Sequence, residues 1–329
     1  MSDRTVGVGI IGRGFGLHVV SDAFRKTEGV DVLAPVSARD ERAVAALIAD
    51  PRVDLVSVHS PPFLHDRHVR MALDAGRSVL CDKPFTDSVE LSRRLAADVA
   101  GAPGVHLLNF EFRFDAARRH TRDTITDGRL GDVERVSWTH YSAGTRHPLR
   151  PYGWLFDRAL GGGWIGAWAS HAVDTLRFTI GEIDRVVSST PTLTVTHRDD
   201  GHGVAHECTA EDGLTAVLAL ANGAIVTLDS TYAASQSVPP RITIAGRDQT
   251  LVNLGDQRVF VVGAEVDDAI ARSDDGDRHA APMRAMAAAV RDSVRAGEPR
   301  HGIATFADGV ACDEVLDALR APPLVRVGR

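Results

Sequence analysis

Lys83 stands directly after a short apolar segment, Val79–Cys81, and is flanked by Asp82 and Pro84. The apolar run predicts a buried parallel strand, and open α/β sheets bind ligands at the carboxyl ends of such strands. Proline lacks a backbone donor and favours an extended conformation in the residue before it, so the strand should end at the lysine. A partly desolvated amine beside a carboxylate is suited to proton transfer. A solvated lysine in a salt bridge with Asp82 is the simpler alternative.

A glycine-rich segment near the start of the chain is suited to phosphate binding. The β-branched run Val6–Ile11 leads into this segment, and a helical pattern follows through Phe24. Glycines permit a tight turn and let the backbone approach a pyrophosphate closely. The usual third glycine would stand at position 17, which is leucine, and a plain strand-to-helix turn is the alternative. The predicted dinucleotide contacts in this loop are Gly12, Arg13, Gly14, Phe15 and Gly16.

The residues after the second expected strand, Val32–Val36, favour one dinucleotide over the other. An acid that binds the ribose of NAD is expected about 20 residues after the glycines, and Ser37 and Arg39 occupy this region instead. A hydroxyl and a guanidinium suit a 2′-phosphate, because arginine pairs with phosphate bidentately. The sequence therefore predicts NADP(H), with NAD(H) as the alternative if Asp40 or Glu41 occupies the ribose position.

Strands and helices alternate through the first third of the chain. A third buried run, Leu55–Val58, precedes a helical pattern that Gly76 ends, and the strand before Lys83 comes next. This alternation predicts a doubly wound parallel sheet. From Val133 onward, strands separated by short turns predict an antiparallel sheet.

A chain of 329 residues is too long for one ordinary core, so two domains are expected. The predicted fold class is α/β, with an N-terminal Rossmann dinucleotide-binding domain and a C-terminal α+β domain that contains a large, mainly antiparallel sheet. The predicted ranges are 1–118 for the dinucleotide-binding domain and 119–329 for a domain that binds substrate and mediates oligomerisation.

The order of several motifs resembles that of the Gfo/Idh/MocA oxidoreductases. These motifs are the glycine loop, Ser60-Pro61-Pro62 with His65 downstream, Asp82-Lys83-Pro84, Asn109 to Phe114, Gly161 to Gly163 and Ser170-His171 with Asp174. The resemblance implies that Lys83 and His171 are catalytic and that His171 faces Lys83. It further implies cofactor contacts by Ser60, Pro61, His65, Asp82, Lys83 and Arg113, and substrate contacts by Lys83, Asn109 and His171.

The chain departs from the family pattern at three places. The family usually has glutamate where Asp82 precedes the lysine, and an acid where Ala167 stands four residues before His171. Between Arg39 and Asp54 there is room for one helix, whereas the family usually has two helices and a short strand there. The resemblance also implies a homodimer or homotetramer that pairs through the C-terminal sheet.

Aromatic residues cluster in the region before and within a helix expected over Trp164–Ile180. Aromatic faces suit the CH face of a sugar or cyclitol, and packing between helix and sheet is the alternative, chiefly for Trp164. The predicted substrate contacts in this region are Tyr152, Trp154 and Trp168.

Composition excludes several classes of partner. Acids outnumber bases by 44 to 37, a net charge of −7, which disfavours nucleic acid. Three scattered cysteines do not form a disulfide framework, and no apolar run is long enough for a membrane helix, so the cytoplasm is the expected location. The histidines near His65 and those between His197 and Cys208 lack a tight ligand spacing, so no metal is expected.

The sequence therefore predicts an NAD(P)-dependent oxidoreductase acting on CH–OH groups. Hydride would pass between the nicotinamide and a secondary alcohol or ketone of a small polyol, ketosugar or cyclitol. Two alternatives remain open: an enzyme that retains NAD(P) and uses transient oxidation for elimination or glycoside cleavage, and a non-catalytic NAD(P)-binding sensor. The sequence leaves the identity of the substrate open, because one fold serves many chemistries.

Overall fold

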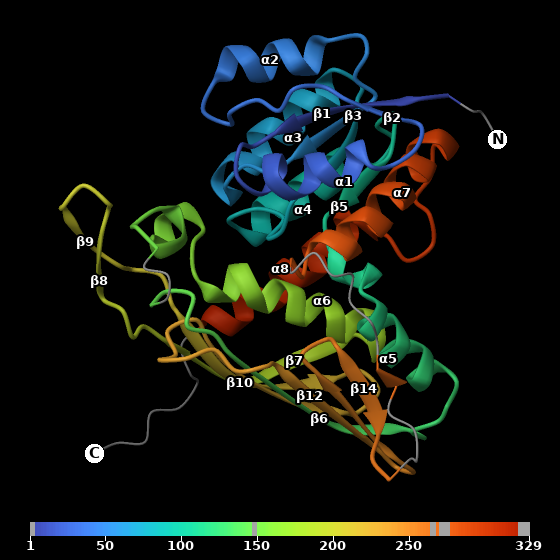
Figure 1. The fold of residues 1–329 in the computed structure, drawn as a ribbon, viewed down its shortest axis with the longest axis vertical. Coiled ribbons are helices and arrows are strands. Elements are labelled where there is room, and N and C mark those ends of the chain that lie inside the picture. The colour runs from blue at the N-terminus through green and yellow to red at the C-terminus, as the bar shows by residue number, and fades with distance from the viewer. Residues whose placement is uncertain (1–3, 147–149, 264–267, 270–276, 322–329) are drawn as a thin grey trace. The chain divides into compact units, whose positions relative to one another are not determined.

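The computed structural model describes residues 4–146, 150–263, 268–269 and 277–321. The chain forms two compact units, each with its own sheet (Figure 1). The first unit comprises Met1–Phe114 and Ser273–Asp313, and the second comprises Asp115–Arg272 and Glu314–Arg329. The sequence placed a single boundary after residue 118. The structure instead returns Ser273–Asp313 to the first unit.

The first unit contains a six-stranded, mostly parallel sheet, as predicted. Its strands are β1 (Val6–Ile11), β2 (Val30–Val32), β3 (Leu55–Val58), β4 (Ser78–Cys81), β5 (His106–Leu108) and β16 (Ala304–Thr305). Their order is β16-β5-β4-β3-β1-β2, and β16 alone of these strands runs antiparallel to its neighbour. Every residue of β1, β3 and β4 is buried, which explains why these strands are continuous apolar runs without polar alternation.

Helical segments lie between the strands of the first unit in the sequence. They are η1 (Gly16–Val20), α1 (Ser21–Arg25), α2 (Glu41–Ala49), η2 (Pro62–Leu64), α3 (His65–Asp74), α4 (Val89–Asp98), η3 (Glu111–Phe114) and α7 (Ala280–Ala296). Asp40 caps α2 by accepting a hydrogen bond from the amide of Ala43 at 3.0 Å. The bounds of α2 are those predicted for the single helix between Arg39 and Asp54.

Helix α7 belongs to the core of the first unit although it lies late in the chain. Met283, Met286 and Val290 are fully buried in the same apolar cluster as Val8 and Phe24. Because both faces of a parallel sheet must be covered, the sheet needs this helix. The sequence predicted one second domain over 119–329, whereas α7, within that range, belongs to the first unit.

The second unit contains an eight-stranded sheet. Its strands are β6 (Val133–Tyr141), β7 (Ile183–Thr192), β10 (Gly213–Leu220), β11 (Ile225–Thr231), β12 (Arg241–Gly246), β13 (Thr250–Leu254), β14 (Arg258–Val261) and β15 (Asp268–Ala269). Their order is β15-β14-β13-β12-β6-β11-β10-β7, and neighbours are antiparallel except β6 and β11. A separate hairpin consists of β8 (His197–Asp199) and β9 (Ala205–Glu207). The predicted α+β domain is confirmed.

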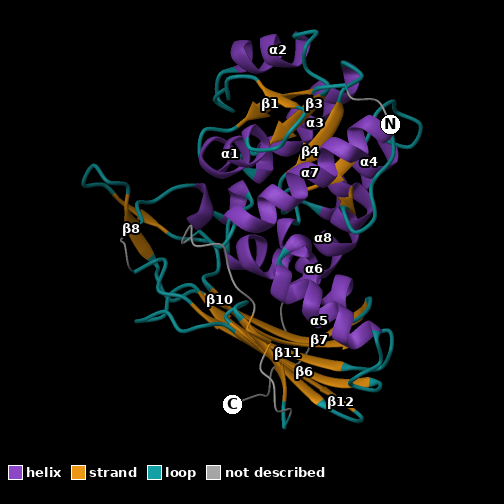
Figure 2. Cartoon of the chain, turned by 45° about the vertical axis from the view of Figure 1, so that its right-hand side comes forward, coloured by secondary structure: helices purple, strands orange, loops and turns teal. Residues whose placement is uncertain are grey.

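Helices cover one face of the large sheet (Figure 2). They include α5 (Ala116–Thr126) and η6 (Ile165–Ala169), which continues into α6 (Ser170–Thr179). Val136, Trp138 and His140 of β6 are buried, whereas Thr215 and Thr227 of neighbouring strands are exposed. This alternation is expected of a sheet with one covered face. Pairing of subunits through the sheet stays a prediction.

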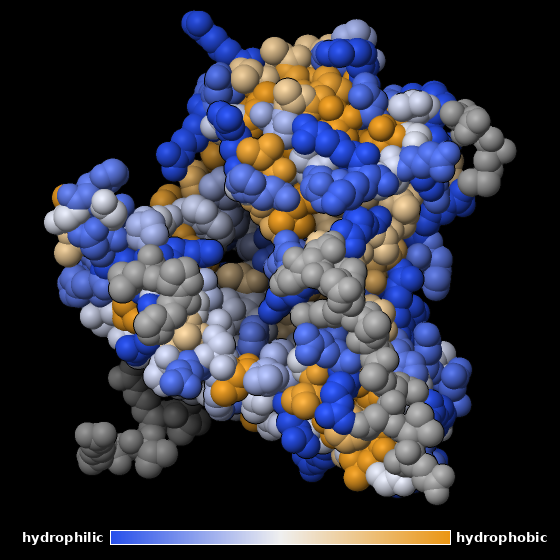
Figure 3. Space-filling view, in the orientation of Figure 1, coloured by the Kyte–Doolittle hydropathy of each residue, from blue (hydrophilic) through white to orange (hydrophobic). Residues whose placement is uncertain are grey.

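The remaining elements connect these layers. They are η4 (Trp154–Phe156), η5 (Arg158–Leu160) and α8 (Phe306–Arg320), within which the chain passes from the first unit to the second. On the face shown in Figure 3, apolar residues are interspersed with hydrophilic ones. No helix in the described part of the chain has both the length and the hydrophobicity needed to cross a bilayer.

Candidate active site

Lys83 lies at the carboxyl end of β4, as predicted, and is partly exposed. The peptide bond between Lys83 and Pro84 is cis. Burial lowers the pKa of Lys83, and the attraction of Asp82 and Glu111 offsets this effect only in part. A lowered pKa makes the neutral amine more available near neutral pH, which a general base requires.

Asp82 is the centre of a hydrogen-bonded group beside Lys83. Its Oδ1 accepts hydrogen bonds from the backbone amide of Lys83 at 3.1 Å and from Nδ2 of Asn109 at 3.2 Å, while Oδ2 lies 3.2 Å from Nδ1 of His59. Burial raises the pKa of Asp82, but the hydrogen bond from His59 and the nearby positive charges outweigh it, so the pKa is lowered. Asp82 is therefore a carboxylate whose orientation is fixed from several sides.

His59 is a member of this group that the sequence reasoning missed. Its side chain is fully buried, and its Nε2 lies 2.7 Å from Oγ of Ser57. Val58 pairs with Cys81 in the register of β3 and β4, so the residues that follow, His59 and Asp82, leave the sheet side by side. His59 could have been identified from the sequence, because His59 and Asp82 are polar residues that directly follow two buried apolar runs.

A second histidine and carboxylate pair contributes to the same region. Nδ1 of His279, just before α7, lies 2.7 Å from Oε1 of Glu111, whose side chain is almost fully buried. The ring of Phe15 lies 5.3 Å from that of His279 and 6.0 Å from that of His59. Sequence spacing gave no signal for His279, because 168 positions separate it from Glu111.

The glycine loop fits a dinucleotide at the carboxyl end of β1. Gly12 has φ of +130°, and a Cβ atom there would lie 2.4 Å from the carbonyl oxygen of His59. A Cβ atom on Gly16 would lie 3.0 Å from Cβ of His59, whereas one on Gly14 would meet nothing within 4 Å. Gly12 and Gly16 therefore allow the close turn, and Gly14 leaves backbone open to a ligand. Arg13 is exposed and Phe15 half-buried beside them.

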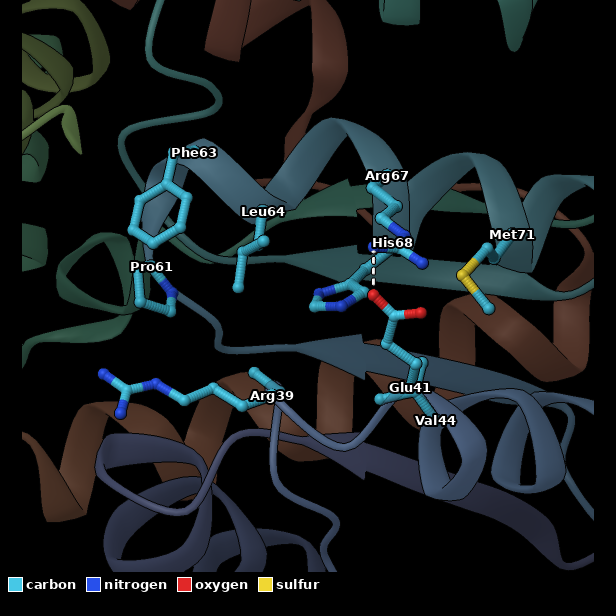
Figure 4. A pocket seen from close by; sticks show the side chains of 10 residues that line it. Arg39, Glu41, Val44, Pro61, Phe63, Leu64, Arg67, His68 and Met71 are labelled. Atoms are coloured by element: carbon cyan, nitrogen blue, oxygen red, sulfur yellow. Dashed lines mark hydrogen bonds and ion pairs between the residues drawn. The ribbon is translucent and has the colours of Figure 1, made fainter. Parts of the chain in front are cut away.

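A pocket opens beside this loop, between the start of α2 and the segment that leads into α3 (Figure 4). Its lining residues are Ala38, Arg39, Glu41, Val44, Pro61, Phe63, Leu64, Arg67, His68 and Met71. Nη1 of Arg67 lies 2.6 Å from Oε1 of Glu41. Burial lowers the pKa of His68 to about 4, so its ring is neutral near pH 7. A mostly apolar pocket with a few polar groups is suited to a small ligand.

The charged residues in and next to this pocket differ in whether another group of the protein already binds them. Asp40 uses its carboxylate to cap α2, and Glu41 pairs with Arg67. Arg39 is exposed, and the described part of the chain gives its guanidinium no ion pair. Its backbone amide donates to Oγ of Ser37 at 3.3 Å. Arg39 is thus the cation on this side of the pocket that is open to a ligand.

His65 holds two loops together. Its Nε2 lies 2.7 Å from the carbonyl oxygen of Ser60, and its Nδ1 lies 3.1 Å and 3.0 Å from those of Pro84 and Phe85. The residue has no exposed surface, and burial lowers its pKa. The direct cofactor contact by His65 that the resemblance implied stays a prediction, and Pro61 lines the pocket. The hydroxyl of Ser60 lies 3.0 Å from Nδ1 of His68.

Two further residues implied by the resemblance are buried. Asn109 has no exposed surface and donates to Asp82. Nη2 of Arg113 lies 2.9 Å from Oδ1 of Asp308, and its side chain is 8% exposed. Both residues therefore support the site from within the first unit, and direct contacts with substrate or cofactor stay predictions.

In the second unit, Trp168 packs in the core. It is 4% exposed, and its ring lies 5.8 Å from that of Trp138, 5.5 Å from that of His140 and 6.1 Å from that of Trp164. Trp168 thus packs between helix and sheet, and its predicted contact with substrate stays a prediction. Trp164, for which packing was the expected alternative, is more exposed and stacks on Tyr232 at 4.5 Å.

The other predicted substrate residues of this unit lie in different environments. Tyr152 is half-buried and stacks on His206 of the β8–β9 hairpin at 4.6 Å. Trp154 is half-buried at the start of η4, and His171 is 6% exposed on α6. Lys83 and His171 belong to different units, so the expectation that they face each other stays a prediction. Among the described residues, no group of three or more His, Cys, Asp or Glu side chains is arranged to hold a metal ion.

Comparison with protein families gives two matches that together cover most of the chain. The sequence model described as "Oxidoreductase family, NAD-binding Rossmann fold" matches residues 5–106. The model described as "GFO/IDH/MocA C-terminal domain" matches residues 119–252.

Individual relatives carry oxidoreductase names. An uncharacterized oxidoreductase of Synechocystis is 28% identical over 276 residues, which are 78% of this chain and 71% of the relative. Inositol 2-dehydrogenase of Rhizobium meliloti is 26% identical over 230 residues, 70% of this chain and 65% of the relative. Levoglucosan dehydrogenase of Pseudarthrobacter phenanthrenivorans is 28% identical over 142 residues, 43% of this chain and 36% of the relative.

Solved structures share the fold over nearly the whole chain. A levoglucosan dehydrogenase in complex with NADH and L-sorbose has a TM-score of 0.85 at 20% identity, with 96% of each chain covered. An NAD binding oxidoreductase from Klebsiella pneumoniae has a TM-score of 0.80 at 19% identity, with 99% of this chain and 100% of that chain covered. At these identities the likeness establishes the fold alone.

Proposed function

Because this chain belongs to the Gfo/Idh/MocA oxidoreductase family, we propose that it interconverts a secondary alcohol and a ketone on a sugar or cyclitol. A bound nicotinamide dinucleotide supplies the hydride acceptor or donor for this chemistry. The observation that carries the proposal is Lys83, an amine of lowered pKa at the carboxyl end of β4. The substrate class follows from relatives named as levoglucosan and inositol dehydrogenases.

Lys83 is the proposed acid or base. Oxidation of an alcohol requires loss of the hydroxyl proton, which the neutral Nζ accepts, and reduction of a ketone uses the ammonium as donor. Burial lowers the pKa of Lys83, which favours the neutral amine, while the attraction of Asp82 favours the ammonium. His171 is the proposed second polar contact of the substrate, with Tyr152 and Trp154 as further contacts.

The first unit contains residues suited to hold the dinucleotide. Gly12, Gly14 and Gly16 supply the close turn, with Arg13 and Phe15 between them. Pro61 and Arg39 line the adjacent pocket. We propose that His65, Asn109 and Arg113 support the site indirectly, because their hydrogen bonds hold the loops that carry these contacts.

We further propose a preference for NADP(H) over NAD(H). Asp40 and Glu41, the acids that would favour a ribose hydroxyl, are engaged by the cap of α2 and by Arg67. Arg39 at the pocket wall suits the 2′-phosphate, because guanidinium and phosphate form charge-assisted, bidentate hydrogen bonds.

Replacing Arg39 with alanine tests this preference. Hydrogen bonds to charged groups contribute about 1.5–3 kcal/mol, so the Kd for NADPH is expected to rise about 10- to 100-fold, and the Kd for NADH to change less than about threefold. Nicotinamide fluorescence titrations at one salt concentration measure both constants. Arg42→Ala, an exposed arginine of α2 outside the pocket lining, is the matched control. Equal losses for both nucleotides would contradict the assignment.

The reaction class is tested by a panel of polyols, cyclitols and ketosugars. Oxidation of a polyol should form reduced nicotinamide in proportion to the ketone product, measured by absorbance and by chromatography. A product that forms without net reduction of the dinucleotide would instead support the retained-cofactor alternative. Tight dinucleotide binding without turnover of any panel member would favour the sensor.

A further inference from the structure

His59 is buried between two partners and reaches no ligand surface of its own. Its side chain is 0% exposed, Nδ1 lies 3.2 Å from Oδ2 of Asp82, and Nε2 lies 2.7 Å from Oγ of Ser57. An ionised carboxylate only accepts hydrogen bonds, so Nδ1 must carry the proton that is donated to Asp82. In the neutral ring, Nε2 then accepts the hydroxyl proton of Ser57. The chain Ser57–His59–Asp82 thus has one hydrogen-bond direction, toward the carboxylate.

The Asp82 carboxylate, at the end of this series of hydrogen bonds, belongs to the residue directly before Lys83. Oδ1 of Asp82 is held by Asn109 and by the backbone amide of Lys83, which leaves Oδ2 to His59. Loss of His59 would therefore free one oxygen of Asp82 and leave its full charge to act on the nearby ammonium.

The other charged groups that act on Lys83 come from three further segments. Glu111 of η3 and Cys312 of α8 raise the pKa of Lys83, and Arg278, which precedes α7, lowers it. Glu111 has its own histidine, His279, at 2.7 Å. These groups stay in place when His59 is changed, so an effect of His59 on Lys83 passes through Asp82.

We propose that His59 is a positioning residue, which fixes the Asp82 carboxylate through Oδ2 and thereby limits the attraction of that carboxylate for the Lys83 ammonium. The consequence for catalysis rests on the proposed function of Lys83. The effect of His59 on the charge state of Lys83 is independent of that proposed function, and it can be measured without substrate.

The sequence offers an unusually direct measurement, because the chain contains two lysines, Lys26 and Lys83. Lysine labelled with ¹³C at Cε gives one signal for each, and the Lys26→Arg variant assigns them. The chemical shift of the Lys83 signal as a function of pH gives its apparent pKa. His59→Leu is expected to raise that value by about one unit, because a freed carboxylate within about 4–6 Å favours the ammonium.

Three further variants separate positioning from general damage. The amide nitrogen of asparagine can occupy the place of Nδ1, so His59→Asn should restore the value of the unchanged protein. Glutamine directs its amide toward the place of Nε2, so His59→Gln should behave like His59→Leu. Ser57→Ala leaves the contact with Asp82 intact and should shift the value by less than about 0.3 units. If His59→Leu fails to fold, the difference between the asparagine and glutamine variants still decides. The proposal would be overturned if Lys83 had the same apparent pKa in His59→Asn and His59→Gln. It would also be overturned if that pKa were the same in His59→Leu and in the unchanged protein.

Turnover then tests the link to the proposed function separately. For an oxidised panel polyol, kcat/KM rises with pH as the base loses its proton, so the acidic limb of the profile in His59→Leu should move to higher pH by the same one unit, a loss of about tenfold at a given pH on that limb. A shift in the titration without a shift in the profile would support the role of His59 and contradict that of Lys83 as base. Unshifted titration with a shifted profile would contradict the role of His59.

Discussion

Replacing Lys83 with alanine is expected to lower kcat by about 10²- to 10⁴-fold, the usual contribution of general acid–base catalysis. Burial lowers the pKa of the Lys83 amine, and the hydrogen bond from His59 lowers the pKa of Asp82 beside it. The Kd of the dinucleotide should change little, because the glycine loop and the Arg39 pocket remain. Steady-state kinetics and nicotinamide fluorescence measure the two quantities on the same preparation.

The chain supplies a matched control for this variant. Lys26, the other lysine, has a 56% exposed side chain and forms a surface ion pair with Asp22 at 2.8 Å, so Lys26→Ala should keep normal turnover. Lys83→Arg preserves the positive charge but cannot supply a neutral amine, and should be as slow as Lys83→Ala. Near-normal kcat in Lys83→Ala or in Lys83→Arg would remove Lys83 from the chemistry.

Replacing Arg118 with methionine is expected to lower the free energy of unfolding of the second unit by about 3–5 kcal/mol, the cost of breaking a buried ion pair. The side chains of Arg118 and Asp256 are 4% and 9% exposed, with Nη2 and Oδ2 3.3 Å apart. Nη1 also lies 2.5 Å from Oγ1 of Thr175 on α6. The variant buries the Asp256 carboxylate without its guanidinium and loosens α6, the helix that carries His171.

Urea unfolding followed by fluorescence of the tryptophans, of which Trp138 and Trp168 lie in the core of the second unit, measures this loss. Adding Asp256→Asn to Arg118→Met should recover more than 1 kcal/mol, because it removes the buried charge and asparagine tolerates the φ of +54° at this position. Arg135→Met, on the exposed face of β6, is the control and should cost less than about 0.5 kcal/mol. Equal stability of the single and double variants would show that the pair is not what holds α6.

The secondary structure was predictable where one local signal dominated. The bounds of α2 follow from the Asp40 cap, and those of β3 from a short buried run. In β6, buried and more exposed residues alternate along most of the strand. Pro191 suggests a break between two strands, whereas the structure has the single strand β7 there. This strand lies at the edge of the sheet, where a proline costs no ladder hydrogen bond.

The site was predictable only in part, for reasons of topology. Lys83 and Asp82 could be found because a strand end places them, and His59 could have been found in the same way. His279 and the α7 core residues could not, because no local pattern indicates which unit a late helix joins. The role of Trp168 stays a prediction, because an aromatic residue on a helix gives the same sequence pattern whether it faces a ligand or a sheet.

The position of α7 and β16 also bears on how the protein is made. The core that surrounds Val8 and Leu107 includes Met283, Val290 and Ile303. The early strands of the first unit are therefore synthesised before the residues that complete their apolar core. About 195 residues separate Leu108 from Ile303, which at about 5–20 residues per second corresponds to about 10 to 40 s of translation. During that interval the early strands carry exposed apolar surface on the ribosome, and the first unit closes only as synthesis nears its end.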